Sequence, residues 1–180
     1  MAKTLTQSEC RLALNPQYES HSLYPSEAEK VLNADGFDRA KQSISQWPGY
    51  APTPLLELSG LAKELDIASL CYKDESSRFD LGSFKPLGGA YAVASLLQAQ
   101  LGERQGGRKP AISELLAGKH RHTAIDITVT AATDGNHGRS VAWGAQLFGC
   151  RCIIFIHETV TNAREHAIAH YGAEVIRTPG

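Results

Sequence analysis

The chain of 180 residues lacks several features that would place it in a class at once. It has no excess of one charge, because 18 lysines and arginines stand against 19 aspartates and glutamates, a formal net charge of −1. A surface for nucleic acid or anionic lipid needs a basic excess, so we expect neither partner. No apolar run reaches membrane length, and the first residues lack the apolar core of a signal peptide. We therefore expect a cytoplasmic protein.

Cysteine is also scarce, with only Cys10, Cys71, Cys150 and Cys152 in the whole chain. In a reducing compartment we expect all four to be thiols. Cys150 and Cys152 could form half of a metal site, but no second Cys or His pair follows at finger spacing. The pair is more typical of two inward-facing residues on a strand, and we expect no metal site.

One lysine stands at the start of an expected helix. Pro86 suits the first helical position, because its missing N–H would have no intrahelical partner there. Lys85 therefore lies at the helix start, after Ser83 and Phe84. Partial desolvation there would free its amine for Schiff-base chemistry. Taken alone, the pattern is more typical of a solvated lysine. The apolar stripe that would bury this helix is Leu87, Ala90, Tyr91, Ala94, Leu97 and Leu101.

Short strands and helices alternate from residue 124 onward. We predict strands at 125–131, 152–156 and 174–176, with helices at 136–148 and 162–171 between them. This pattern indicates an α/β fold with an open parallel sheet and flanking helices. Ligands of such sheets bind beyond the carboxyl ends of the strands, where the turn before the first helix would lie. The free N–H groups of that helix favour negative charge.

Further predictions concern helix ends and loops. Asn162 followed by Glu165, and Ser26 followed by Glu29, are capping signals, while Gly149 and Gly172 fit the position just past the end of a helix. The charged residues at 73–82 are typical of a solvated face, and we expect only one or two of them to have a function. Residues 102–122 are typical of an exposed loop around a short helix at 112–117.

The two motifs together resemble a known family. Ser-Phe-Lys at 83–85, followed by Thr-Asp-Gly-Asn-His-Gly at 133–138, is similar to the pyridoxal-phosphate enzymes of the tryptophan-synthase-β type, fold type II. Leu-Gly-Gly-Ala-Tyr at 87–91 and Lys-Asp-Glu at 73–75 make the chain look most like the diaminopropionate ammonia-lyase family. Thr-Pro-Leu at 53–55 falls where the superfamily usually carries it. The likeness runs from about Pro52 to the end of the chain, which corresponds to the N-terminal part of the family.

The resemblance implies roles for named residues. Lys85 would hold the cofactor, pyridoxal 5′-phosphate, through its aldehyde and then serve as a base at the substrate Cα. Asn136 would hydrogen-bond the ring oxygen of the cofactor, and Gly135 and Gly138 would allow close backbone approach. Asp134 would be a second acid/base, so that the α-proton of either enantiomer can be taken. In the same motif, His137 would orient the turn.

The implied reaction is α,β-elimination of 2,3-diaminopropionate to pyruvate and ammonia by an enzyme that is commonly a homodimer. One alternative is a serine/threonine dehydratase or another β-elimination or β-replacement enzyme of the same fold. A dinucleotide-binding oxidoreductase is a weaker alternative, because no Gly-x-Gly-x-x-Gly follows a strand. A third is a non-catalytic, truncated fragment that keeps the family's motifs.

The resemblance also divides the chain. Residues 1–50 would be an N-terminal arm, 51–83 the start of the large cofactor-binding domain, and 84–180 a small βαβ domain that is truncated at its C-terminal end. In the family, the phosphate loop and the group facing the pyridine nitrogen come later than the part that this chain matches. We therefore expect residues 1–180 alone to be an inactive lyase with a poorly covered sheet edge at 174–176.

Overall fold

The computed structural model of the chain describes residues 15–16 and 24–179, so that Cys10 lies outside the described part. The chain forms two compact units, residues 1–37 and 38–180, and the division falls within helix α2 (Ala34–Ile44). In the first unit, α1 (Ser26–Glu29) follows Pro25, which is its N-cap residue and makes no side-chain cap hydrogen bond. The capping role predicted for Ser26 is therefore wrong.

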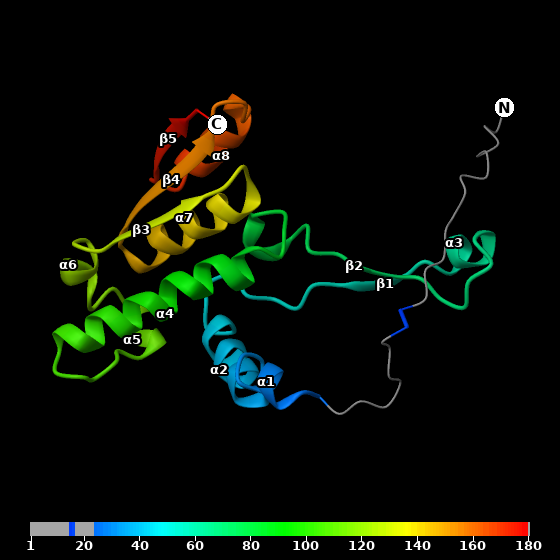
Figure 1. Ribbon diagram of the computed structural model, residues 1–180, viewed down its shortest axis with the longest axis horizontal. Helices are drawn as coiled ribbons and strands as arrows, with labels where there is room; N and C mark the ends of the chain where they lie inside the picture. Colours follow the sequence, from blue (N-terminus) through cyan, green and yellow to red (C-terminus); the bar gives the residue numbers. More distant parts are fainter. Residues whose placement is uncertain (1–14, 17–23, 180) are drawn as a thin grey trace. The chain divides into compact units, whose positions relative to one another are not determined.

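The second unit contains the predicted parallel sheet. Strands β3 (Thr128–Ala132), β4 (Arg151–His157) and β5 (Glu174–Thr178) pair in the order β3-β4-β5, all parallel (Figure 1). The crossovers are α7 (Asn136–Phe148) and α8 (Asn162–Ala169). These elements confirm the α/β class and the alternating order expected from the sequence.

The helix that follows Lys85, α4 (Pro86–Arg104), packs closely on α7. A Cβ atom on Gly144 would lie 2.8 Å from the Cα of Ala90, and one on Gly89 would overlap Ser140 Oγ. The backbones of the two helices therefore approach each other where glycine leaves room. This contact fixes the start of α4 relative to the start of α7.

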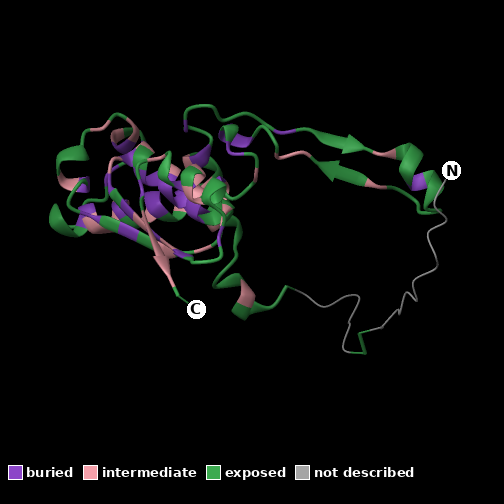
Figure 2. Cartoon of the chain, turned by 90° about the horizontal axis from the view of Figure 1, so that it is seen from above, coloured by how far each residue is buried: buried purple, intermediate pink, exposed green. Residues whose placement is uncertain are grey.

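An aromatic cluster closes the core beneath these helices. The ring centroid of Trp47 lies 5.9 Å from those of Phe79 and Trp143 and 5.8 Å from that of Phe148. Trp47 is only 2% exposed, so the segment after α2 contributes to the core of the second unit. Buried residues, purple in Figure 2, are concentrated in the helices and strands of this unit. The largest apolar side chains that are almost fully buried there are Leu97, Leu101, Leu115, Phe148, Ile154, Ile156 and Ile168.

Residues 55–73, which precede the loop that leads to Lys85, contain a two-stranded antiparallel ribbon. Strand β1 (Leu55–Glu57) pairs with β2 (Cys71–Lys73), and α3 (Ser59–Glu64) lies between them in the chain. Every residue of both strands is exposed, and the segment is mostly green in Figure 2. The large apolar side chains exposed along this segment are Leu55, Leu56, Leu61, Leu65, Ile67 and Tyr72.

Other predicted boundaries are partly right. Helix α5 (Ile112–Leu116) lies where a short helix was expected, but α6 (Arg121–Ala124) replaces the end of the predicted loop, and β3 begins at Thr128 rather than at 125. Gly149 and Gly172 have left-handed backbones with φ of 82° and 79°, which fits their predicted places just after α7 and α8. Among the described residues, no helix is both long and apolar enough to span a bilayer.

The capping signal predicted at Asn162 and Glu165 is wrong. The N-cap residue of α8 is Thr161, and Asn162 Oδ1 instead accepts a hydrogen bond from Arg177 of β5 at 3.0 Å. Arg177 Nε also donates to Glu165 Oε2 at 2.9 Å. Both side chains therefore tie α8 to β5.

The cysteine pair is buried, as predicted, although only Cys152 lies within a strand. Cys150, just before β4, and Cys152, in β4, are free thiols, and burial raises the pKa of each to about 11. Cys71, in β2, is an exposed free thiol. Buried thiols with raised pKa values are poor nucleophiles, which fits a packing role for the pair.

Candidate functional site

Both sequence motifs line one open hollow of about 370 Å³. Lys85 comes from the start of α4, and the turn between β3 and α7 supplies the opposite motif. The structure thus brings together segments that are about fifty residues apart in sequence. The described residues that line it are Lys85, Thr133, Asp134, Gly135, Asn136, His137, Arg139, Arg164, Ala167 and Ile168.

Lys85 occupies the helix start that the sequence predicted. It is the N-cap residue of α4, its carbonyl accepts the N–H groups of Gly88 and Gly89, and the buried Pro86 is the first helical residue. Its Nζ lies 4.9 Å from the ring centroid of Phe84, which is itself 58% exposed. Lys85 is exposed, so the desolvation expected for its amine is not provided by the described residues of this chain.

The turn at 133–138 continues the carboxyl end of β3. The Thr133 N–H donates to the Phe155 carbonyl of β4 at 2.9 Å, and the Gly135 N–H donates to Thr133 Oγ1 at 3.4 Å. Helix α7 begins directly after, at Asn136, so its first N–H groups point toward this end of the sheet. The turn therefore presents backbone donors to the hollow.

The two glycines of this turn have different surroundings. Apart from its two chain neighbours, no atom of the described residues lies within 4 Å of a Cβ built on Gly135, so the space in front of its backbone is open. A Cβ on Gly138 would lie 2.5 Å from Thr133 Cγ2 and 3.1 Å from Ile154 Cγ2. Gly138 is thus required by packing, while Gly135 leaves room for a ligand.

Asp134 lies at the rim of the hollow. Its side chain is 83% exposed, and the closest cation is Arg164 of α8, whose Nη1 lies 4.0 Å from Asp134 Oδ2. Arg164 Nη1 also approaches the Asp134 carbonyl oxygen at 3.4 Å. An exposed ion pair at this distance contributes little to stability. The carboxylate therefore remains accessible to a ligand.

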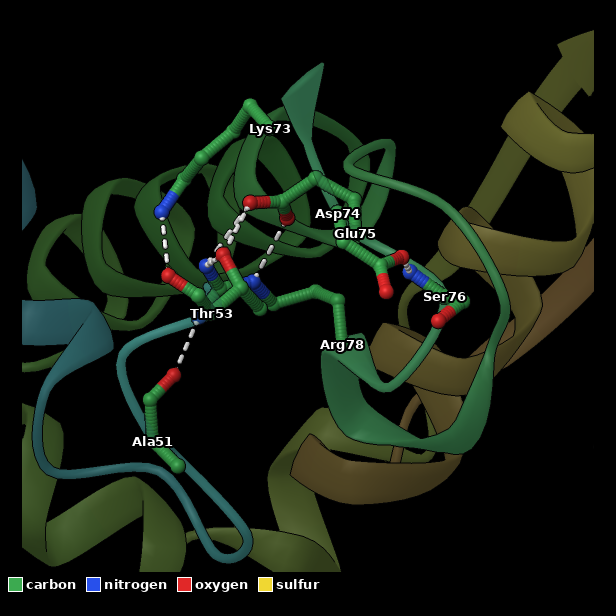
Figure 3. Close-up of polar contacts among 7 residues, drawn as sticks. All are labelled: Ala51, Thr53, Lys73, Asp74, Glu75, Ser76 and Arg78. Atoms are coloured by element: carbon green, nitrogen blue, oxygen red, sulfur yellow. Dashed lines mark hydrogen bonds and ion pairs between the residues drawn. The ribbon is translucent and has the colours of Figure 1, made fainter. Parts of the chain in front are cut away.

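A largely buried ion-pair network lies just before residues 79–85, which lead to Lys85 (Figure 3). Arg78 is 7% exposed, and its Nε donates to Glu75 Oε2 at 2.8 Å. Its Nη1 donates to the Ala51 carbonyl at 2.7 Å, and its Nη2 donates to Thr53 Oγ1 at 2.9 Å. Lys73 Nζ also donates to the Thr53 carbonyl, at 2.6 Å. The network therefore joins the chain before β1 to the chain after β2.

The backbone between Arg78 and Lys85 is strained. Phe79 and Asp80 have left-handed φ values of 50° and 57°, and Gly82 has a φ of 67°. A left-handed conformation costs most residues with a Cβ roughly 1–2 kcal/mol, whereas glycine adopts it freely and aspartate adopts it more readily than a bulky residue such as Phe79. Surrounding contacts must therefore hold Phe79 and Asp80 in place.

Arg139, in the first turn of α7, supplies one such contact. Its Nη1 donates to the Leu81 carbonyl at 3.1 Å, and its Nη2 lies 3.4 Å from the Asp80 carbonyl oxygen. Its guanidinium carbon also lies 5.8 Å from the ring centroid of Tyr171. Arg139 therefore links the helix that follows one motif to the segment that precedes the other.

The sequence did not predict that Arg139 and Arg164 line the hollow, or that Arg78 forms a network next to the segment that leads to Lys85. The expectation of a solvated face at 73–82 is wrong for the buried Arg78 and the largely buried Glu75, which form an ion pair. Glu75 and Arg78 are three positions apart and stand just before the apolar Phe79, which is the signal that could have indicated a buried ion pair. Arg139 and Arg164 lie in helices whose ends meet only in the fold.

The chain is similar in sequence to known proteins. Residues 46–180 match the family described as pyridoxal-phosphate dependent enzyme. Diaminopropionate ammonia-lyase of Escherichia coli is 40% identical over 141 residues, which are 77% of this chain and 33% of the relative. A catabolic L-threonine dehydratase of Staphylococcus aureus is 27% identical over 146 residues, 81% of this chain and 34% of the relative.

A crystal structure of the E. coli diaminopropionate ammonia-lyase in complex with an aminoacrylate-PLP azomethine reaction intermediate superposes with a TM-score of 0.64. It is 36% identical, and the match covers 81% of this chain and 34% of that chain. This chain thus spans about a third of the length of the relatives it matches. Because the family match covers most of the sequence and the fold agrees, the chain belongs to the family of pyridoxal-phosphate-dependent enzymes, with the fold type II arrangement.

Proposed function

We propose that the full-length protein carrying this chain catalyses the α,β-elimination of 2,3-diaminopropionate to pyruvate and ammonia. The observation that carries this proposal is that Lys85 lines the same hollow as Asp134 and Asn136. The relative that is 40% identical to the chain over 141 residues has the corresponding activity in its name. The Asp-Gly-Asn-His-Gly sequence of the turn favours this reaction over the dehydration of a hydroxy amino acid.

The residues present fit pyridoxal 5′-phosphate. The cofactor carries an aldehyde and an anionic phosphate, and the hollow offers the primary amine of Lys85 together with a second cation, Arg164, while the Arg139 guanidinium donates to the carbonyls of Asp80 and Leu81. Its volume of about 370 Å³ falls within the range of small-molecule sites. Open space in front of Gly135 and the N-terminus of α7 suit a flat, anionic ligand.

The residues of this chain then take the following roles. The bound cofactor supplies an electron sink, which makes the α-proton of an amino acid removable and lets a β-substituent leave. Lys85 Nζ holds the cofactor covalently and serves as one base at the substrate Cα. The Asp134 carboxylate serves as the second base. Asn136 holds the ring oxygen of the cofactor, and Gly135 lets it approach; Gly138 keeps the turn compact.

The first experiment tests the reaction. The purified full-length protein, loaded with cofactor, is given D- and L-diaminopropionate, L-serine and L-threonine, and pyruvate or 2-oxobutyrate and ammonia are measured. We expect release of pyruvate from diaminopropionate to exceed turnover of the hydroxy amino acids. Preferred turnover of serine or threonine would instead support the dehydratase alternative, to which the 27% identical relative corresponds.

The second experiment tests the role of Asp134. Asp134→Asn keeps the size of the side chain and removes its basicity. Because a general base contributes on the order of a hundred- to ten-thousand-fold, kcat should fall by that factor for one enantiomer of diaminopropionate. The other enantiomer should react nearly as before, and cofactor binding should survive. Equal small losses for both enantiomers would rule out two separate bases.

The remaining expectations about the whole protein belong to the same proposal. We infer that 51–83 begins a large cofactor-binding domain, that 84–180 is part of a small domain, and that the full-length enzyme is a cytoplasmic homodimer. Light scattering after gel filtration of the full-length protein tests the dimer. A monomer that turns over diaminopropionate would separate the oligomeric state from the proposed activity.

A further inference from the structure

The segment that carries Lys85 adopts a conformation that its own residues disfavour. Three of the four residues 79–82 have positive φ, and two of these three, Phe79 and Asp80, carry a Cβ. Strain of this kind persists only where neighbouring contacts determine the conformation. Lys85 lies three residues after Gly82. The contacts on this segment therefore determine the position of the Lys85 backbone, from which its amine extends.

One side of the segment is fixed through Arg78 and Phe79. All three nitrogens of the Arg78 guanidinium donate hydrogen bonds, to Glu75, Ala51 and Thr53. The ring of Phe79 packs against Trp143 with centroids 4.9 Å apart. These contacts hold the beginning of the segment against the core, but they do not reach the turn that faces Lys85.

The other side is fixed by Arg139. Its Nη1 and Nη2 contact the carbonyls of Leu81 and Asp80, and the same residue lies three positions after Asn136 in α7. In the part of the chain that the structure describes, no carboxylate pairs with Arg139; its contacts are these carbonyls and Tyr171. The guanidinium is therefore committed to the backbone of the lysine segment rather than to an ion pair.

We propose that Arg139 is a positioning residue for Lys85. By joining the carbonyls of residues 80 and 81 to the first turn of α7, it sets the Lys85 amine against the turn that contains Asp134 and Asn136. The planar guanidinium suits this task, because it offers two donor nitrogens in a fixed fork, whereas a lysine offers a single nitrogen at the end of a flexible side chain. The inference rests on the proposed function, since it concerns the position of Lys85 in the same hollow.

The test compares Arg139→Met, Arg139→Lys and Arg104→Met in the full-length protein. Arg104 is an exposed residue at the end of α4, so it is a matched control for loss of an arginine. The first measurement is amide hydrogen exchange in the cofactor-free protein. For Arg139→Met we expect exchange in the peptide 79–88 to be roughly tenfold faster, as for one lost hydrogen bond to a charged group. Exchange in β4 should not change.

The second measurement is made with cofactor. In Arg139→Met, added pyridoxal phosphate should attach to Lys85 more slowly, as followed by visible absorbance. The kcat should fall on the order of a hundredfold, the loss typical of a misplacement of about 1 Å, with little change in KM. Arg139→Lys should lie between Arg139→Met and the unchanged protein, and Arg104→Met should match the unchanged protein.

Two results would overturn the inference. One is wild-type exchange at 79–88 together with a wild-type rate of cofactor attachment in Arg139→Met. The other is an equal rise in exchange over all peptides, which would make Arg139 a general stabilising residue. Neither result depends on which substrate is used. If Lys85 binds the cofactor and Arg139→Met slows that step, but diaminopropionate is not consumed, the proposed function fails while this inference stands.

Discussion

Glu75 accepts hydrogen bonds from both Arg78 and Thr53 while its side chain is only 15% exposed. The hydrogen bond from Arg78, together with the smaller contribution of that from Thr53, outweighs desolvation and lowers the pKa of Glu75 from 4.5 to about 2. A carboxylate whose pKa is lower in the folded state than in the unfolded state stabilises the fold above the unfolded pKa. This contribution is lost as the pH falls from about 4.5 to about 2.

The pH dependence of unfolding tests this single residue. We expect Glu75→Gln to be destabilised above pH 5, by up to about 3 kcal/mol at roughly 1.4 kcal/mol per unit of pKa shift. Between pH 4.5 and pH 2 the difference from the unchanged protein should shrink. The matched control is Glu57→Gln, an exposed residue of β1, which should show little difference at any pH. A constant difference for Glu75→Gln across this range would argue against a charged, paired Glu75.

At the scale of elements, the contact between α4 and α7 sets the distance between the two motifs. Gly144 of α7 faces the backbone of Ala90, and a methyl group there would lie 2.8–2.9 Å from Ala90 atoms. Gly144→Ala should push the helices apart and destabilise the protein by about 1–3 kcal/mol, the usual cost of overpacking.

The control lies in α4 itself. Beyond the backbone of α4 itself, no atom in the described part of the chain would lie within 4 Å of a Cβ on Gly88, so Gly88→Ala should only gain helix propensity and stabilise the protein by about 0.5–1 kcal/mol. Chemical denaturation of both variants measures the two effects. Equal shifts of the same sign would show that the close approach of the helices does not limit packing.

Several elements could be predicted because their signals are local. Pro86 fixed the start of α4, and the α7 prediction of 136–148 matches the observed bounds, ended by a left-handed Gly149. The network around Arg78 could not be predicted in this way, because Thr53 and Arg78 are 25 residues apart and meet only in the fold. For the same reason the sequence predicted which motifs form the hollow but not the arginines, Arg139 and Arg164, that line it.

At the scale of the whole molecule, the apolar side chains exposed along the β1–α3–β2 segment are expected to determine whether the chain associates. Tyr72 and Leu55 are 53% and 66% exposed on strands that lie in a two-stranded sheet. Such a surface favours association. We expect residues 1–180, expressed alone, to associate at micromolar concentration in gel filtration, and the double variant Leu55→Ser/Tyr72→Ser to associate less. A monodisperse monomer of the unchanged chain would contradict this expectation.

A separate prediction concerns cofactor retention by residues 1–180 alone. The hollow is open, and the described residues supply an amine and a turn rather than a closed site for the phosphate. A covalent bond to an exposed lysine that forms reversibly is not enough for tight binding. We expect pyridoxal phosphate to be lost from this chain on gel filtration and retained by the full-length protein. Stoichiometric retention, together with pyruvate release by the 180-residue chain, would contradict the prediction.

The most direct test of the central claim is to locate the cofactor in the full-length protein. The holoenzyme is reduced with borohydride, digested, and analysed by mass spectrometry for the peptide that carries the added mass of reduced pyridoxal phosphate. We expect a single modified residue, Lys85, and loss of both the label and pyruvate formation in Lys85→Ala. A label on Lys73 or on another lysine, or full activity of Lys85→Ala, would contradict the assignment of Lys85.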